Sequence, residues 1–180
     1  MIIAFAGRRI DADKAGEPGK FPLANVDRVH REVEQLLRER RPAVVVGSAA
    51  CGADLLVLEA AGRLGIRRRV VLPFDRAAFR ASSVTDRPGD WGPRFDDVVA
   101  AVATGDLIEL PFDADDATAY EETNLEIFRQ CEALASLGEQ CEVLIVWNGE
   151  TRGKGDVTEA FLHEAERRGW PTAQIQTNGT

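Results

Sequence analysis

The residues that could bind a phosphate gather at three turns that contain glycine. Each turn follows an apolar run, and two of them lead into a pattern typical of a helix. A helix N-terminus preceded by small residues presents backbone N–H groups to an anion, and arginine adds a planar fork of donors. We therefore predict ligand contacts from Gly7, Arg8, Gly47, Ser48, Gly52, Asp54, Gly153 and Gly155.

The middle turn matches neither of the common phosphate loops. Ala53 stands where a Walker A loop has lysine, and the glycines do not have the spacing GxGxxG. The alternative is that glycine occurs here only because the backbone requires it. Cys51 lies in the same turn, but the pattern offers no neighbouring base, so we expect a small buried residue rather than a nucleophile.

Two carboxylates after the last glycine turn are candidates for catalysis. Asp156 and Glu159 lie where a helix over residues 157–168 is predicted to begin. A carboxylate can stabilise a positively charged sugar ring or position a water molecule. Each also has a structural alternative, because Asp156 is a natural N-cap and a negative charge at Glu159 suits the start of a helix.

Three further residues are candidate ligand contacts. Tyr120 and Asn124 are one helical turn apart, so both can face one pocket, where tyrosine stacks on a base or bonds a ribose and asparagine reads a base edge. The alternative is a helix start that packs on the sheet. Arg80, in the middle of the chain, is a candidate phosphate partner.

The elements that must position these residues alternate along the chain. Unbroken apolar runs predict strands at residues 2–6, 44–46, 70–72, 107–110, 143–147 and 173–175, and helical spacing predicts helices at 26–37, 54–64, 77–81, 91–102, 120–137 and 157–168. This order indicates one α/β domain over residues 1–180, a Rossmann-like, doubly wound, mostly parallel sheet with helices on both faces. Ligands of such sheets bind at the carboxyl ends of the strands, where the glycine turns converge. The polar loop over residues 11–22 is long enough to be a lid.

Composition narrows the class of partner. The formal net charge of −8 argues against a general nucleic-acid binder, and no apolar run approaches a membrane span. Three cysteines without paired spacing indicate reduced thiols in the cytoplasm. His30 and His163 are far apart, with His30 expected at the surface, so we predict neither a metal site nor a cofactor.

The order of the motifs resembles the SLOG superfamily, the Rossmann-like group that contains the Lonely Guy phosphoribohydrolases and the DNA-processing protein A domain. The resemblance rests on Ala6-Gly7, Gly47-Ser48-x-x-x-Gly52-Ala53-Asp54 and Gly153-x-Gly155-x-x-x-Glu159. It is closer to a bacterial branch attached to signalling modules through Leu72-Pro-Phe74, Phe79-Arg80, Ser83-Val84, Gly89-Asp90-Trp91, Arg94-Phe95 and Tyr120-Glu121-x-x-Asn124.

The resemblance implies a nucleotide or NAD-derived ligand, with its phosphate at the glycine turns. Hydrolases of the superfamily pair the late glutamate with an arginine on the preceding helix, which here reads Tyr120-Glu-Glu-Thr-Asn124 instead. We therefore expect a cytoplasmic nucleotide sensor or signalling domain, as a homodimer or fused to an effector domain. The alternatives are a nucleotide N-glycosidase that uses Glu159, with Asp156, and a dimeric interaction module without a ligand.

Overall fold

The strands form a single parallel sheet. The computed structural model describes residues 1–12, 19–135 and 138–179, so residues 13–18 of the candidate lid lie outside the described part. Within it the sheet has six strands in the order β4-β3-β2-β1-β5-β6. They are β1 Ile2–Gly7, β2 Val44–Gly47, β3 Arg67–Leu72, β4 Leu107–Glu109, β5 Cys141–Trp147 and β6 Thr172–Gln176, and every pairing is parallel. The predicted α/β, Rossmann-like, doubly wound fold is confirmed.

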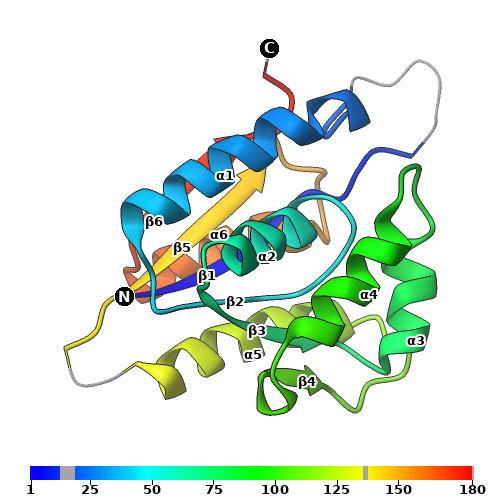
Figure 1. Ribbon diagram of the computed structural model, residues 1–180. Helices are drawn as coiled ribbons and strands as arrows, with labels where there is room; N and C mark the ends of the chain where they lie inside the picture. Colours follow the sequence, from blue (N-terminus) through cyan, green and yellow to red (C-terminus); the bar gives the residue numbers. More distant parts are fainter. Residues whose placement is uncertain (13–18, 136–137, 180) are drawn as a thin grey trace.

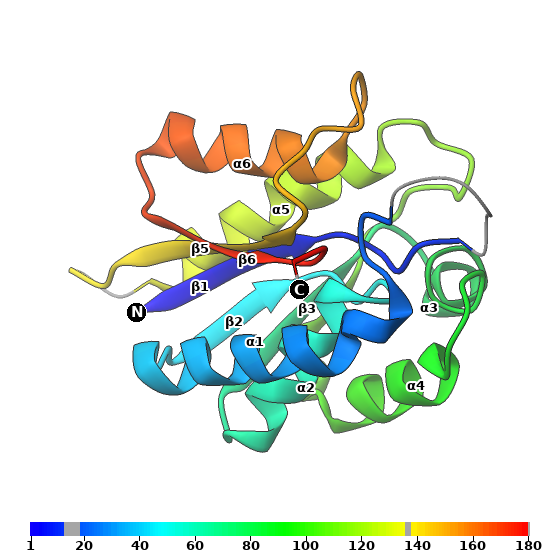
Figure 2. The ribbon, with the colours of Figure 1, turned by 90° about the horizontal axis from the view of Figure 1, so that it is seen from above.

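Helices cover both faces of this sheet. On one face lie α1 (Val26–Arg40), α2 (Ala53–Arg63) and α4 (Trp91–Ala101), and on the other lie α5 (Ala119–Leu134) and α6 (Val157–Arg168) (Figures 1 and 2). The chain runs outward from β1 to β4 and then returns to place β5 on the other side of β1. The switch point of the sheet therefore lies between β1 and β5, where ligands of such folds bind.

Alternation along the strands divides the core between the two faces. In β1, Ile3 and Phe5 pack with the cluster under α1, α2 and α4, whereas Ile2 and Ala4 pack with the cluster under α5 and α6. All four are buried. Because both faces of the sheet are covered, its strands are continuous apolar runs, which is why they could be recognised in the sequence.

The helices begin and end for local reasons. α1 buries the stripe Val26, Val29, Val33 and Leu37 and ends at Arg41, which takes the left-handed conformation at φ 49°. α6 begins at Asp156, whose side chain accepts from the Thr158 and Glu159 amides, and ends at Gly169 at φ 67°. Asp156 is thus the N-cap that the sequence offered as an alternative to catalysis.

The segment after β3 differs from the prediction. The short helix α3 spans Arg76–Phe79 and continues directly into a π-helical turn, η2, over Arg80–Val84, where the sequence predicted one helix over residues 77–81. Short 3-10 turns occur at Leu23–Asn25 (η1) and Thr104–Asp106 (η3). The helix predicted over 120–137 ends at Leu134, and residues 136 and 137 lie outside the described part.

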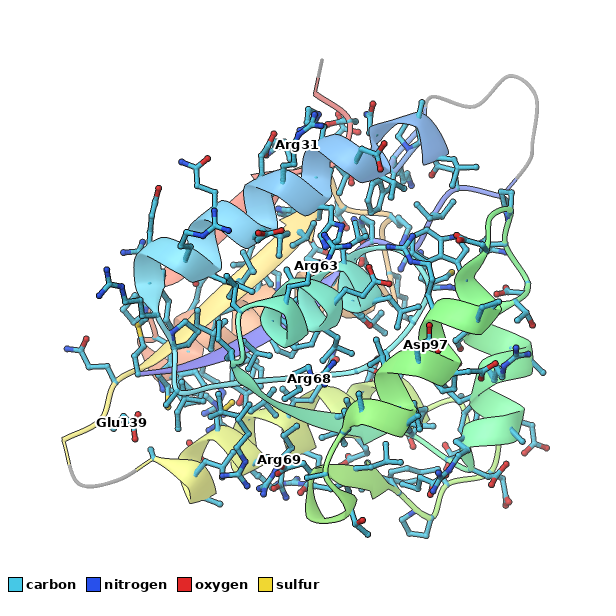
Figure 3. All side chains as sticks on the ribbon, in the orientation of Figure 1. Arg31, Arg63, Arg68, Arg69, Asp97 and Glu139 are labelled. Atoms are coloured by element: carbon cyan, nitrogen blue, oxygen red, sulfur yellow. The ribbon has the colours of Figure 1, made fainter. Side chains whose placement is uncertain are left out.

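Arginine and histidine side chains make contacts with neighbouring elements at two places that the sequence did not predict. Arg68 and Arg69 project to opposite sides of β3 (Figure 3), so that Arg68 bonds the Ala101 carbonyl at the end of α4 and Arg69 bonds Gln130 on α5. His30 is buried, contrary to the expectation of a surface position, because it faces Glu59 of α2 rather than solvent.

Candidate functional site

A pocket of about 270 Å³ lies at the carboxyl ends of β1 and β2, beside the switch point. α5 and the loop between β5 and α6 complete its walls. Its lining residues are Phe5, Ala6, Gly7, Arg9, Ser48, Ala50, Asp54, Phe79, Ser83, Tyr120, Thr123, Asn124, Ile127, Arg152, Gly155, Val157 and Thr158. The structure thus brings together six predicted contacts, namely Gly7, Ser48, Asp54, Tyr120, Asn124 and Gly155.

Packing and backbone conformation account for three of the predicted glycines. A Cβ at Gly7 would lie 2.4 Å from the Ala53 Cβ and the Val146 carbonyl oxygen, and one at Gly47 would lie 2.4 Å from the Phe5 ring. Gly52 has φ +95°, which other residues rarely adopt. Gly47 and Gly52 do not line the pocket.

Three backbone amides in the turn between β2 and α2 donate hydrogen bonds to other groups of the protein. The Cys51 N–H donates to the Ser83 carbonyl, and the Ala53 N–H donates to the Arg8 carbonyl, each at 3.0 Å. The Ala50 N–H donates to Asp54 Oδ2 at 3.1 Å. The Asp54 carboxylate therefore bonds one of the amides to which the sequence led us to expect a phosphate to bind.

Asp54 is a buried acid in the wall of the pocket, with 8% of the residue exposed. Burial raises its pKa from 3.8 to about 7, against the opposing effects of the Ala50 amide and the Arg9 charge. Its neighbour Cys51 is fully buried as expected, and burial also raises the pKa of the Cys51 thiol.

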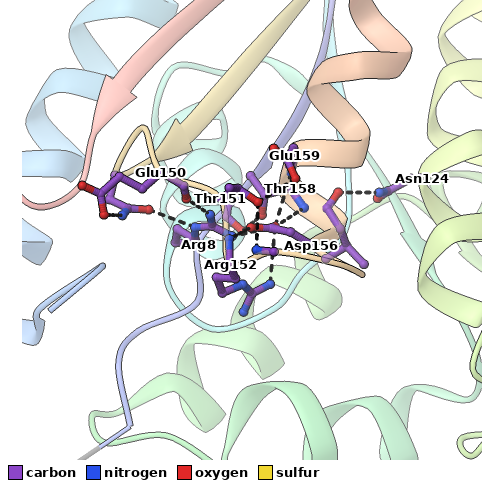
Figure 4. A network of polar contacts seen from close by, with 12 residues as sticks. Arg8, Asn124, Glu150, Thr151, Arg152, Asp156, Thr158 and Glu159 are labelled. Carbon is purple, nitrogen blue, oxygen red and sulfur yellow. Dashed lines mark hydrogen bonds and ion pairs between the residues drawn. The ribbon is translucent and has the colours of Figure 1, made fainter. Parts of the chain in front are cut away.

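Arg8 and Asp156 form a buried clamp between β1 and the loop that precedes α6 (Figure 4). Arg8 Nη1 donates to Asp156 Oδ1 at 2.7 Å, and Arg8 Nε donates to Asn148 Oδ1 at 3.1 Å. Burial alone would raise the pKa of Asp156, but the Arg8 hydrogen bond and the Arg152 amide together hold it well below its usual range. Both side chains are satisfied within the protein, and neither lines the pocket.

The cations that do line the pocket are Arg9 and Arg152. Arg9 follows β1 and forms an ion pair with Asp86, while its buried Nε has no hydrogen-bond partner among the described residues. Arg152 belongs to the last glycine turn, and its Nη2 lies 3.6 Å from Asp156 Oδ1. From the sequence we expected Arg8, rather than Arg9, to contact the ligand. Consecutive side chains of extended backbone point in opposite directions, so only one of these adjacent arginines faces the pocket.

Tyr120 and Asn124 face the pocket together, one helical turn apart on α5. The Tyr120 hydroxyl lies 2.8 Å from Ser83 Oγ, and the Asn124 Nδ2 donates to the Val157 carbonyl at 2.8 Å. This bond fixes the orientation of the Asn124 amide, whose oxygen and second N–H can still bond a ligand. Ser83 was not among the predicted contacts, because its π-helical turn has no clear sequence signature.

The remaining predicted residues lie elsewhere. Arg80 is bonded to Asp96 at 2.8 Å outside the pocket. Glu159 accepts from Thr151 Oγ1 at 2.6 Å. With Gly153 and Asp156 it lines a second hollow of about 200 Å³, which also contains Glu121, Lys154 and His163. The two candidate catalytic carboxylates therefore do not line the main pocket.

Neither a metal site nor a membrane-spanning helix is observed in the part of the chain that the structure describes. It contains no group of three or more histidine, cysteine, aspartate or glutamate side chains arranged to hold a metal ion. Nor does any described helix combine the length and apolar character needed to cross a membrane.

Comparison with known proteins identifies the fold. No family model matches the sequence, and no curated protein matches it. The X-ray structure of TM1055, a target of the Northeast Structural Genomics Consortium, aligns with 95% of this chain and 71% of its own at a TM-score of 0.54 and 13% identity. The strand order and this match show a Rossmann-like α/β fold, as the alternation of elements in the sequence predicted.

A second solved structure is similar at a lower level. DNA processing protein A from Streptococcus pneumoniae aligns with 98% of this chain and 59% of its own, at 14% identity and a TM-score of 0.34. That score is too low to bear on the fold.

Proposed function

We propose that the pocket binds a nucleotide or an NAD-derived molecule, and that the protein acts as a sensor or signalling domain in the cytoplasm. The observation that carries the proposal is the pair of arginines, Arg9 and Arg152, which reach one pocket from the loops after β1 and β5. Guanidinium groups are the side chains best suited to hold phosphate oxygens.

The rest of the pocket suits a flat ring and a sugar. Phe5, Phe79 and Ile127 supply apolar wall, while Tyr120 and Asn124 supply a hydroxyl and an amide oxygen. Its volume of about 270 Å³ is near the lower end of small-molecule sites. One nucleotide unit is therefore a better match than a bulky ligand.

The test is a thermal-shift and calorimetric screen of ADP-ribose, NAD, mononucleotides and cyclic nucleotides. A ligand of the native state raises the unfolding midpoint. Arg152→Ala should weaken binding by about tenfold to a hundredfold, the effect of losing a charge-assisted hydrogen bond. Arg31→Ala is the matched control, since it removes an exposed arginine from α1 (Figure 3) and should leave affinity unchanged. Absence of binding, or equal effects of the two variants, would contradict the proposal.

Product analysis in the same assay separates a sensor from a hydrolase. Recovery of intact ligand supports a sensor, whereas release of free base would indicate N-glycosidase activity. In that case Glu159→Gln should abolish turnover only if ligand reaches the second hollow, where Glu159 lies. If none of the screened molecules binds, the alternative of a dimeric interaction module would be favoured.

A further inference from the structure

Asp54 differs from the other buried carboxylates that the structure describes. Asp106, Glu142 and Asp156 each form an ion pair with at least one arginine. Asp54 is buried to a similar degree, yet within the described residues no cationic side chain forms an ion pair with it. A buried carboxylate without a counter-ion is costly, so the neutral form is favoured.

The hydrogen bond that the described residues give Asp54 determines where its proton would lie. Oδ2 accepts from the Ala50 N–H at 3.1 Å. The proton of the neutral acid therefore belongs on Oδ1, and a protonated carboxyl donates one hydrogen bond. Because Asp54 lines the pocket, that donor is available to a ligand.

The ionisable groups around Asp54 favour binding of an anion next to this residue only when Asp54 is neutral. Arg9, Arg152 and Tyr120 line the same pocket, Cys51 lies in the same turn, and Asp86 neutralises part of the Arg9 charge. Arg9 alone acts on Asp54 as a neighbouring positive charge, and it does not outweigh burial. An ionised Asp54 would repel a phosphate held by the two arginines.

We propose that Asp54 is an anion-binding residue in its protonated form, donating from Oδ1 to a phosphate oxygen, and that the pocket takes up one proton when the ligand binds above neutral pH. This inference rests on the proposed function. It restricts the ligand to molecules with an acceptor oxygen at this position, such as a phosphate ester, and excludes a cationic group there.

Because ligand binding is linked to protonation of Asp54, the affinity for the ligand depends on pH. At a pH where Asp54 is already neutral, affinity does not depend on it. Above that range a proton must be bound together with the ligand, so affinity falls by about tenfold for each pH unit. The ligand itself must not titrate, since a phosphomonoester loses its second proton near about pH 6. A 3′,5′-cyclic nucleotide meets this condition because its single phosphate is diesterified, and it is one nucleotide unit in size.

The experiment is calorimetric titration of the whole chain with 3′,5′-cyclic AMP between about pH 6 and about pH 9. Repeating it in buffers of different ionisation enthalpy counts the protons taken up. In Asp54→Asn the amide oxygen can still accept from Ala50, and the amide N–H replaces the carboxyl donor. We expect this variant to bind equally well across the range and to take up no proton, while the wild type loses affinity.

Asp97→Asn is the control, because it removes an exposed carboxylate on α4 (Figure 3) and should keep the wild-type pH profile. Binding by the wild type that does not change with pH would overturn this inference alone. A falling profile that persists in Asp54→Asn would also overturn it, since another group would then be titrating. Failure of both proteins to bind cyclic AMP or any other ligand of the screen at the lowest pH would contradict the proposed function and this inference together.

Discussion

Two aspartates occupy comparable positions at the two helix starts beside the pocket, and their pKa values are shifted in opposite directions. Asp156 caps α6 and has Arg8 as a buried partner, which holds its pKa low in spite of burial. Among the described residues Asp54, in the first turn of α2, has only the Ala50 amide as a hydrogen-bond partner, and burial raises its pKa. The placement of one arginine therefore decides which aspartate carries a fixed charge and which can carry a proton near neutral pH.

The stability of the protein should record this proton even without a ligand. The pKa of Asp54 is about 7 in the folded state against 3.8 as the ordinary value. Between these values the folded state holds a proton that the unfolded state has released, so stability falls as pH rises and levels off above the folded pKa. The contribution that is lost is at most about 4 kcal/mol, taking about 1.4 kcal/mol for each pH unit.

Urea denaturation of the wild type and Asp54→Asn at about pH 5 and about pH 8 measures this effect. We expect the variant to gain stability relative to the wild type as the pH is raised. Asp97→Asn should follow the wild type at both values. A stability difference between wild type and Asp54→Asn that is the same at both pH values would mean that Asp54 does not titrate in this window.

Adjacent residues mark the limit of what the sequence predicts at this scale. The sequence indicated that an arginine directly after β1 contacts the ligand, and both Arg8 and Arg9 fit that description. Which of them turns into the pocket depends on long-range partners, since Arg8 is held by Asn148 and Asp156. Those partners are about 140 residues away in the chain, at separations of 140 and 148, and no local pattern reveals them.

At the scale of the elements, the turn between β2 and α2 is held closely against the end of β1. Gly7 is the point of closest approach, because a Cβ there would lie 2.4 Å from both the Ala53 Cβ and a backbone oxygen of β5. Neither atom belongs to a flexible side-chain end, so the strand and the helix would have to separate.

Gly7→Ala should therefore destabilise the protein by about 1–3 kcal/mol, the usual cost of overpacking, and should weaken ligand binding because the wall of the pocket moves. Gly105→Ala is a matched control, since a Cβ at Gly105 would meet nothing within 4 Å. Chemical denaturation of both variants gives the comparison. Equal stability of the two would show that the contact at Gly7 is readily relieved.

Strands and long helices could be predicted because both faces of the sheet are covered, which leaves clear apolar runs and stripes. The segment Arg76–Val84 could not, because a π-helical turn has no periodicity of its own and its serines are typical of a loop. That segment brings Ser83 to the Tyr120 hydroxyl and to the Cys51 amide. Helical spacing predicted that Tyr120 and Asn124 share one face of α5, whereas it could not predict Ser83, the partner of the Tyr120 hydroxyl.

Over the whole molecule, the fold consists of two apolar layers that share one sheet. Trp91 belongs to the cluster on the side of α1, α2 and α4, while Trp147 belongs to the cluster on the side of α5 and α6. Trp170 packs against the second cluster. β1 contributes side chains to both, so disruption of one layer removes the support of the other. The pocket lies at the edge where the two layers meet, and its shape depends on both.

This arrangement predicts that the chain unfolds as a single cooperative unit, in keeping with the one domain expected from the sequence. Trp91→Phe leaves tryptophans only on the α5 and α6 side, and the double variant Trp147→Phe, Trp170→Phe leaves only Trp91. For each variant, the urea transition followed by fluorescence should coincide with that followed by far-ultraviolet circular dichroism. The midpoints of the two variants can differ, because each loses its own packing, but the two probes within one variant must agree.

If Trp91 reported unfolding at lower urea than the circular dichroism of the same protein, the layer formed by α1, α2 and α4 would open independently. The pocket would then lose the wall formed by Asp54 while the wall formed by Tyr120 and Asn124 remained, and ligand should abolish the early transition by binding only the intact pocket.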